Sequence, residues 1–185
     1  LEAGERFATG LDATEDFDLT WAAEQKVVLQ STHGFDGPLF QVLKDVDPTF
    51  TVNGERPFQA RNAAQYEVEI LMAPSRTPHY PFTEALRPVP LPEQEWLLLG
   101  RPISQILCDR SGAACRLVVP DPRWMALHKL WLADKPERNP RKKPKDHAQG
   151  KALLSVLGRA LPHYPLDTAF FDSVPTELRR YLPPV

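Results

Sequence analysis

Proline residues divide this chain into short pieces, and they constrain its fold more than any other feature of the sequence. Twenty of the 185 residues are prolines, and proline fixes the backbone angle φ and donates no backbone hydrogen bond. Six of them lie between Pro74 and Pro92, which predicts a long surface segment without helix or strand. Further groups fall in residues 136–144 and at the end of the chain, so regular structure is expected between these groups.

The residues up to about 119 carry the patterns of short strands and one helix. Alternating or continuous apolar runs predict strands at residues 17–21, 26–30, 49–53, 58–62, 66–72, 103–108 and 115–119. A helix is predicted at residues 37–46. Hairpins are predicted around residues 54–57 and around the turn that separates Cys108 from Cys115. This region is therefore expected to be mixed α/β.

The remaining residues change to a helical pattern. Pro122 stands where the first turn of a helix tolerates proline, and apolar residues follow it at helical spacing. A second helix is predicted at residues 145–161, and Pro162 ends it. We expect an α+β chain in two regions, a mixed α/β core over residues 1–119 and a small helical region over residues 120–185.

The composition is that of a globular protein and excludes several other classes. Hydrophobic residues make up 42% of the chain and charged residues 25%, a mixture typical of globular domains. The net charge of −2 gives no general attraction to nucleic acid or anionic membrane, so a nucleotide must be held by a local site. No apolar run approaches the roughly 18 residues of a membrane span. The two cysteines are interpreted as reduced, half-buried thiols, and the expected location is the cytoplasm.

The strongest local signal is the sequence Asp16-Phe17-Asp18. Residues two apart on a strand point to the same face, so Asp16 and Asp18 would present a pair of carboxylates. Two such charges repel each other unless a cation lies between them, and carboxylate oxygens are ligands that Mg²⁺ prefers. The alternative interpretation is a solvated pair of aspartates at the start of a strand.

Two glutamates supply a candidate for a third ligand. Glu67 and Glu69 share one face of the strand predicted at residues 66–72, and a neighbouring strand would bring one of them beside the aspartate pair. The alternative is the polar face of a half-buried antiparallel strand. A metal-dependent nuclease built from Asp18 and both glutamates is a weaker alternative, because that class usually carries a lysine just after the second acid, where Ile70 stands.

Three segments of the chain resemble a known superfamily. Residues 13–19, Ala-Thr-Glu-Asp-Phe-Asp-Leu, resemble the Thr-x-Asp-(Ile/Phe/Val)-Asp-Leu strand of polymerase-β-like nucleotidyltransferases. Residues 118–131 resemble a Pro-x-x-(Phe/Trp)-x-Leu-His-Lys-Leu helix of a bacterial branch of that superfamily, and residues 143–149 resemble the start of its Asp-x-x-Gln helix. The combination of the three segments is more specific than the Asp-x-Asp motif alone.

The resemblance implies a fold and a reaction. The fold is a mixed, twisted sheet with helices on one side, followed by further helices, which is the nucleotidyltransferase fold. The reaction is the attack of a hydroxyl group of a protein, RNA or small molecule on the α-phosphate of a nucleoside triphosphate such as ATP, with Mg²⁺ or Mn²⁺. By matching positions, Asp16, Asp18 and Glu69 would hold the metal ions and serve catalysis. Glu69 is preferred to Glu67 because the family's third acid lies in a Val-(Asp/Glu)-(Leu/Ile) strand.

One element of the superfamily's pattern is not found before Asp16 in this sequence. The superfamily carries a Gly-Ser or Gly-Thr pair at a helix start ahead of the aspartate strand, where the helix N-terminus holds the triphosphate. We expect this pair upstream of Leu1. The alternative is a non-catalytic nucleotidyltransferase-fold module of a toxin–antitoxin or other two-component system, which would act with a protein partner.

Lysines of the helical region are candidates for contacts with the phosphates of the nucleotide. Lys129 lies on the first predicted helix beside His128, and Lys145 lies in the basic segment 135–145. A lysine contacts phosphate as a point charge. The alternatives are a helix surface packed around His128 and a solvated basic loop. Asp146 would lie at the start of the second helix, where the helix dipole favours an acidic residue.

Overall fold

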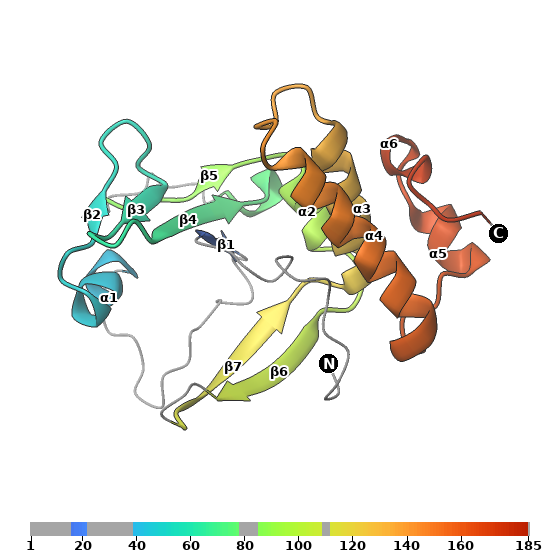
Figure 1. The fold of residues 1–185 in the computed structure, drawn as a ribbon, viewed down its shortest axis with the longest axis horizontal. Helices are drawn as coiled ribbons and strands as arrows, with labels where there is room; N and C mark the ends of the chain where they lie inside the picture. The colour runs from blue at the N-terminus through green and yellow to red at the C-terminus, as the bar shows by residue number, and fades with distance from the viewer. Residues whose placement is uncertain (1–15, 22–38, 78–84, 109–111, 185) are drawn as a thin grey trace. The chain divides into compact units, whose positions relative to one another are not determined.

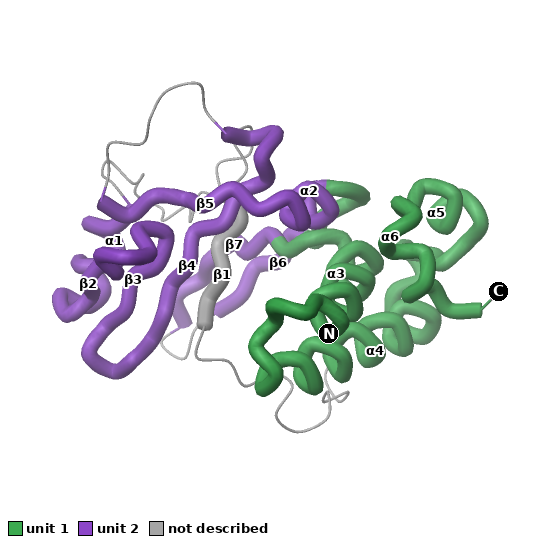
Figure 2. Tube along the Cα trace, turned by 90° about the horizontal axis from the view of Figure 1, so that it is seen from above, with its two compact units in different colours: residues 1–13, 99–103, 119–185 green, residues 14–98, 104–118 purple. Residues whose placement is uncertain are grey.

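The computed structural model describes residues 16–21, 39–77, 85–108 and 112–184, with residues 16–21 described by their backbone (Figure 1). The chain divides into two compact units (Figure 2), and each is described by itself. One unit contains the described parts of residues 14–98 and 104–118, and the other contains residues 99–103 and the described part of residues 119–185. The predicted strand at residues 26–30 lies outside the described residues, and the predicted division at residue 119 stays a prediction.

A mixed sheet lies in the unit that Figure 2 labels unit 2. Its strands are β1 (Asp16–Trp21), β2 (Thr51–Val52), β3 (Gln59–Arg61), β4 (Glu67–Met72) and β5 (Val89–Pro90). They are ordered β1-β4-β3-β2, and β5 also pairs with β4. Strand β4 runs parallel to β1 and β5 and antiparallel to β3, so it lies at the centre of the sheet. This arrangement confirms the expected α+β class with a mixed sheet.

The core of this unit lies on one face of the sheet. Burial alternates along β4, where Val68, Ile70 and Met72 are buried and the residues between them are half-buried. Helix α1 (Leu39–Val46) packs three of its apolar side chains against the core. The cluster comprises Phe50, Ala60, Val68, Ile70 and Leu86, with Leu39, Phe40, Leu43 and Val52 against it. Because successive residues of a strand point to opposite faces, Glu67 and Glu69 lie on the face that this core does not occupy.

The prediction that residues 74–92 contain neither helix nor strand was wrong. A short 3-10 helix, η1 (Pro74–Arg76), and the two-residue strand β5 lie within them, and α2 (Gln94–Leu97) follows. Proline is tolerated in a strand at an edge position, and β5 pairs with only the last two residues of β4. Strand β5 can form in the proline-rich segment because a two-residue strand needs few backbone hydrogen bonds.

Strands β6 (Ile103–Cys108) and β7 (Ala114–Val119) pair with each other in a separate two-stranded sheet, which confirms the predicted hairpin. Cys108 and Cys115 are free thiols and are exposed, so the expectation of half-buried cysteines was wrong. The physical reason is that most residues of both strands are exposed, on both faces of the hairpin.

Helices make up most of the described part of unit 1 in Figure 2, the helical unit. They are α3 (Pro122–Asp134), α4 (Lys143–Ala160), α5 (Thr168–Ser173) and α6 (Thr176–Arg179). Helices α3 and α4 pack closely, because Gly150 on α4 lets the backbone approach; a Cβ atom there would lie 2.6 Å from Leu130 Cγ. No helix within the described residues combines the length and apolar character that crossing a membrane requires.

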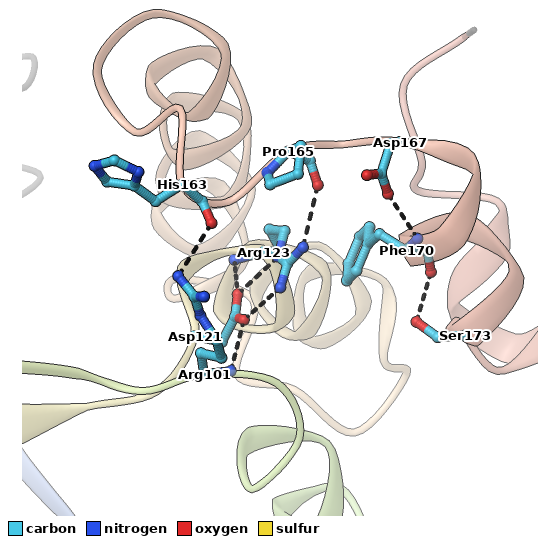
Figure 3. Close-up of polar contacts among 8 residues, drawn as sticks. All are labelled: Arg101, Asp121, Arg123, His163, Pro165, Asp167, Phe170 and Ser173. Carbon is cyan, nitrogen blue, oxygen red and sulfur yellow. Dashed lines mark hydrogen bonds and ion pairs between the residues drawn. The ribbon is translucent and has the colours of Figure 1, made fainter.

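A buried ion pair fixes the start of α3 (Figure 3). Asp121 is fully buried and caps the helix by accepting a hydrogen bond from Arg123 N at 3.0 Å. The Arg123 guanidinium also donates to both carboxylate oxygens of Asp121, at 3.1 and 2.8 Å, and to Pro165 O at 3.1 Å. The Cζ atom of Arg123 lies 4.5 Å from the centre of the Phe170 ring. The backbone N–H of Arg101 donates to Asp121 Oδ2 at 2.9 Å. The described partners of this carboxylate belong to the helical unit, so it has a structural role.

Candidate active site

The backbone of β1 and β4 brings the predicted acidic positions together. Asp16 is the register partner of Glu67, and Asp18 is the register partner of Glu69. Register partners on neighbouring strands lie about 4.8 Å apart in the direction of the backbone hydrogen bonds. The four acidic positions therefore form two neighbouring pairs across β1 and β4, and this group is called the acidic row. The two aspartates are placed here by their backbone.

The side chain of Glu69 is held by a neutral hydrogen-bond donor. Gln59 is its register partner on β3, and Gln59 Nε2 donates a hydrogen bond of 2.9 Å to Glu69 Oε1. Gln59 is buried, with 5% of its surface exposed, and Glu69 is half-buried. A hydrogen bond to a carboxylate limits its orientations without cancelling its charge. Glu69 therefore presents a positioned negative charge next to the place of Asp18.

The side chain of Glu67 has a different kind of partner. Its Oε1 forms an ion pair with Arg61 Nη2, and Arg61 is the register partner of Glu67 on β3. A guanidinium ion supplies a full positive charge to the carboxylate. The described contacts of the two glutamates therefore differ, a hydrogen bond from Gln59 to Glu69 and an ion pair between Arg61 and Glu67. The preference for Glu69 drawn from the sequence stays a prediction.

A divalent metal ion fits the chemistry of these positions. Carboxylate oxygens are the ligands that Mg²⁺ prefers, and neighbouring carboxylates are stable together when a cation offsets their repulsion. Asp16, Asp18 and Glu69 would supply three such groups from two adjacent strands. Among the side chains that the structure describes, which exclude those of the two aspartates, no three metal-ligating groups gather in one place.

Lys129 belongs to the helical unit and lies in an ion-pair cluster. Its Nζ is 3.0 Å from Asp146 Oδ1, and Arg138 Nε is 2.7 Å from Asp146 Oδ2. Burial alone would raise the pKa of Asp146, but the hydrogen bond from Arg138 and the charge of Lys129 outweigh it and hold the pKa below its ordinary value. The cluster links α3 to α4 and to the basic segment between them. It gives Lys129 a structural partner that the sequence analysis did not foresee.

The other predicted residues of the helical unit are placed as follows. Lys145 is half-buried in the first turn of α4. Asp146 is in the same turn, as predicted from the helix dipole, and is buried. His128 is buried, and its ring packs edge-to-face against Trp131 with 6.3 Å between ring centres. The packed interpretation of His128 is therefore confirmed.

Sequence reasoning missed Gln59 as a partner of the site. Two strands were predicted at residues 58–62 and 66–72, with a short connection between them. Pairing them as a hairpin would have placed Gln59 opposite Glu69, as the structure does. A polar residue within a predicted strand, opposite a candidate ligand, was the available signal.

The fold and the acidic row define an α+β protein with a mixed sheet that gathers carboxylate positions from two parallel strands, followed by helices. The model of a nucleotidyltransferase family matches residues 1–174, and the chain belongs to this family. No match of comparable significance was found among curated proteins or among solved structures. Nucleotidyltransferases transfer a nucleoside monophosphate from a nucleoside triphosphate and generally use a divalent metal ion.

Proposed function

We propose that this protein is an active, metal-dependent nucleotidyltransferase that moves a nucleoside monophosphate from a triphosphate such as ATP to a hydroxyl group. The observation that carries the proposal is the register of β1 and β4, which makes Asp18 the partner of Glu69. The hydrogen bond from Gln59, which leaves the charge of Glu69 in place, supports it further. The acceptor would be a protein, an RNA or a small molecule, and the reaction would take place in the cytoplasm.

The acidic residues would have separate tasks in the reaction. Asp16 and Asp18 would bind Mg²⁺ or Mn²⁺, and Glu69 would complete the set of ligands. When bound, the metal ion neutralises phosphate charge and makes the acceptor hydroxyl more acidic. Glu69 would orient the acceptor hydroxyl and take its proton as the new bond to phosphorus forms. The pyrophosphate leaves from the opposite side of the α-phosphate in an in-line displacement.

The lysines of the helical unit would contribute to phosphate binding. Lys145, half-buried at the start of α4, is proposed as a direct contact. Lys129 is already paired with Asp146, so a contact between Lys129 and a phosphate would be shared with that carboxylate. Substitution of Lys145 tests this part of the proposal.

The test is calorimetric titration of the full-length protein with ATP and with GTP, in the presence and absence of Mg²⁺, for wild type and Asp18→Asn. Asparagine keeps the size of the side chain and removes its charge. Asp45→Asn is the matched control, because Asp45 is an exposed acid on α1 outside the acidic row. We expect binding that requires Mg²⁺, is lost in Asp18→Asn and is retained in the control.

Two results would overturn the proposal. Binding by Asp18→Asn equal to that of wild type would remove the aspartate from the site. Failure of the full-length wild type to bind any triphosphate would favour a non-catalytic module that acts with a protein partner.

A further inference from the structure

Gln59 occupies an unusual place for a polar side chain. It lies on β3, it is 5% exposed, and its neighbour Ala60 is fully buried on the other face of the sheet. A buried carboxamide needs hydrogen-bond partners for both its oxygen and its NH₂ group. Gln59 has both, because its Oε1 accepts from Asn53 Nδ2 at 2.8 Å and its Nε2 donates to Glu69 Oε1 at 2.9 Å.

The direction of this chain of hydrogen bonds is fixed by the backbone of the turn between β2 and β3. Asn53 Oδ1 accepts from the backbone N–H of Glu55 at 3.0 Å and of Arg56 at 3.2 Å. A backbone N–H group can only donate, so the oxygen of Asn53 must face the turn and its NH₂ group must face Gln59. The oxygen of Gln59 then receives that NH₂ group.

The NH₂ group of Gln59 is consequently aimed at Glu69. This assignment does not depend on distinguishing nitrogen from oxygen in either carboxamide, because the turn amides determine both orientations. The turn is itself held by two backbone hydrogen bonds, from Asn53 N to Gln59 O at 2.8 Å and from Gln59 N to Arg56 O at 2.9 Å. The donor that reaches Glu69 is thus anchored to a closed backbone turn.

The donor that Gln59 presents to Glu69 is electrically neutral. Arg61 forms an ion pair with Glu67. The carboxamide of Gln59 limits the orientation of Glu69 and adds no net charge. An arginine at position 59 would compete with a cation for the same carboxylate. A carboxamide supports a cation there because it restricts the ligand before the cation arrives.

We propose that Gln59, oriented by Asn53, is a positioning residue that holds the Glu69 carboxylate ready for a divalent cation. The inference rests on the proposed function, since it assigns to Glu69 the binding of that cation. It adds a polar relay from the β2–β3 turn through Asn53 and Gln59 to Glu69, so the turn determines the geometry of a ligand on another strand.

The experiment measures Mn²⁺ binding by calorimetry on the full chain without nucleotide. Gln59→Leu removes the donor at nearly the same side-chain size, and we expect the dissociation constant for Mn²⁺ to rise about 10-fold or more, as is typical when the partner of a metal ligand is lost. Gln41→Leu is the control, because Gln41 is exposed on α1 and contacts Asp45 alone among the hydrogen bonds described for its side chain. Circular dichroism and thermal melting verify that each variant is folded.

Asn53→Asp separates positioning from simple electrostatics. The carboxylate keeps the acceptor that the turn amides need, but it presents an oxygen to Gln59, so the carboxamide of Gln59 must turn its NH₂ group toward residue 53 and its oxygen toward Glu69. An added negative charge alone would strengthen Mn²⁺ binding. The relay predicts weaker binding by Asn53→Asp. Because this effect passes through Gln59, adding Asn53→Asp to Gln59→Leu should cause no further weakening.

The outcomes distinguish this inference from the proposed function. If Asp18→Asn abolishes Mn²⁺ binding while Gln59→Leu and Asn53→Asp bind like wild type, the positioning role is wrong and the metal site stands. If wild type and Asp18→Asn show the same Mn²⁺ binding, or none, both are overturned. Weaker binding in folded Gln59→Leu and Asn53→Asp, with an unchanged Gln41→Leu control, supports the relay.

Discussion

Asp18 on β1 is the register partner of Glu69 on β4, and the two strands run parallel to each other. Parallel neighbours must be joined by a long connection, so these acids come from segments far apart in the chain. Their proximity is a property of the fold and not of local sequence. In the proposed site, this register would let Glu69 complete the acidic pair. Glu69 accepts a hydrogen bond from Gln59, and Glu67 forms an ion pair with Arg61.

The two glutamates of β4 are expected to differ in function. Glu69→Gln should weaken Mn²⁺ binding and nucleotidyl transfer by about 100-fold. Loss of a residue that only supports a metal ligand costs up to about 100-fold, and loss of a ligand should cost at least as much. Glu67→Gln should cost less than about 10-fold, because Arg61 already partners that charge. Calorimetry and a transfer assay with labelled triphosphate provide the comparison. Equal effects of the two changes would contradict the assignment.

The sequence predicted the strands of the acidic row because their signals are local. Alternation of apolar and acidic residues in residues 66–72 gave β4, and the apolar flanks of the aspartate pair gave β1. Pro122 marked the start of α3 for the same kind of reason, since its position in the first turn depends only on φ and a missing donor. These elements follow from the residues within each segment.

The contacts between segments could not be predicted in the same way. The sequence around Lys129 does not indicate that Lys129 forms an ion pair with Asp146, because that pair forms only when α3 and α4 pack together. The hydrogen bond from Gln59 to Glu69 likewise depends on the register of β3 against β4. Strand β5 was missed because its pairing with β4 overrides the usual effect of prolines.

The cluster around Asp146 is expected to stabilise the helical unit. Asp146→Asn leaves Lys129 and Arg138 without the charge that both contact, and it should lower the free energy of unfolding by about 1–3 kcal/mol. The matched control is Asp134→Asn, whose ion pair with Arg180 is largely exposed and is worth less than about 1 kcal/mol. Urea unfolding measures both. A larger loss in the control would show that the buried cluster is not the main link.

The same variant should change the pH dependence of stability in a defined direction. The folded pKa of Asp146 is lower than its ordinary value of 3.8, so its contribution is complete above that value and is lost as the pH falls through the lower folded pKa. The stability difference between wild type and Asp146→Asn should therefore be constant near neutral pH and shrink below about pH 4. A difference that grows on acidification would contradict this origin.

Lys145 is expected to contribute to nucleotide affinity as a single charge. A lysine near a phosphate in a solvated site contributes about 1 kcal/mol, so Lys145→Met should weaken ATP binding about 5-fold. Lys151→Met is the control, because Lys151 is exposed on the same helix. The effect should diminish at high salt, which screens exposed charges. Identical affinities for the two variants would assign Lys145 to the solvated basic surface.

Two glycines of α4 provide a test of how closely α3 and α4 pack. Alanine is a better helix former than glycine by about 1 kcal/mol, so a substitution that meets no obstacle should stabilise the protein. At Gly158 a new Cβ would have no neighbour within 4 Å. At Gly150 it would lie 2.6 Å from Leu130 Cγ and 2.9 Å from the backbone oxygen of Ala126. Gly158→Ala should therefore raise the free energy of unfolding by up to about 1 kcal/mol.

Gly150→Ala should have the opposite sign. The new methyl group must displace Leu130 or push the two helices apart, which costs about 1–3 kcal/mol and exceeds the gain in helix propensity. Urea unfolding of the two alanine variants compares these effects within one helix. A stabilised Gly150→Ala variant would mean that α3 and α4 leave room for a methyl group at residue 150. This would contradict the 2.6 Å between a Cβ atom there and Leu130 Cγ. Destabilisation of both variants would instead point to an effect of alanine that is independent of the α3–α4 contact.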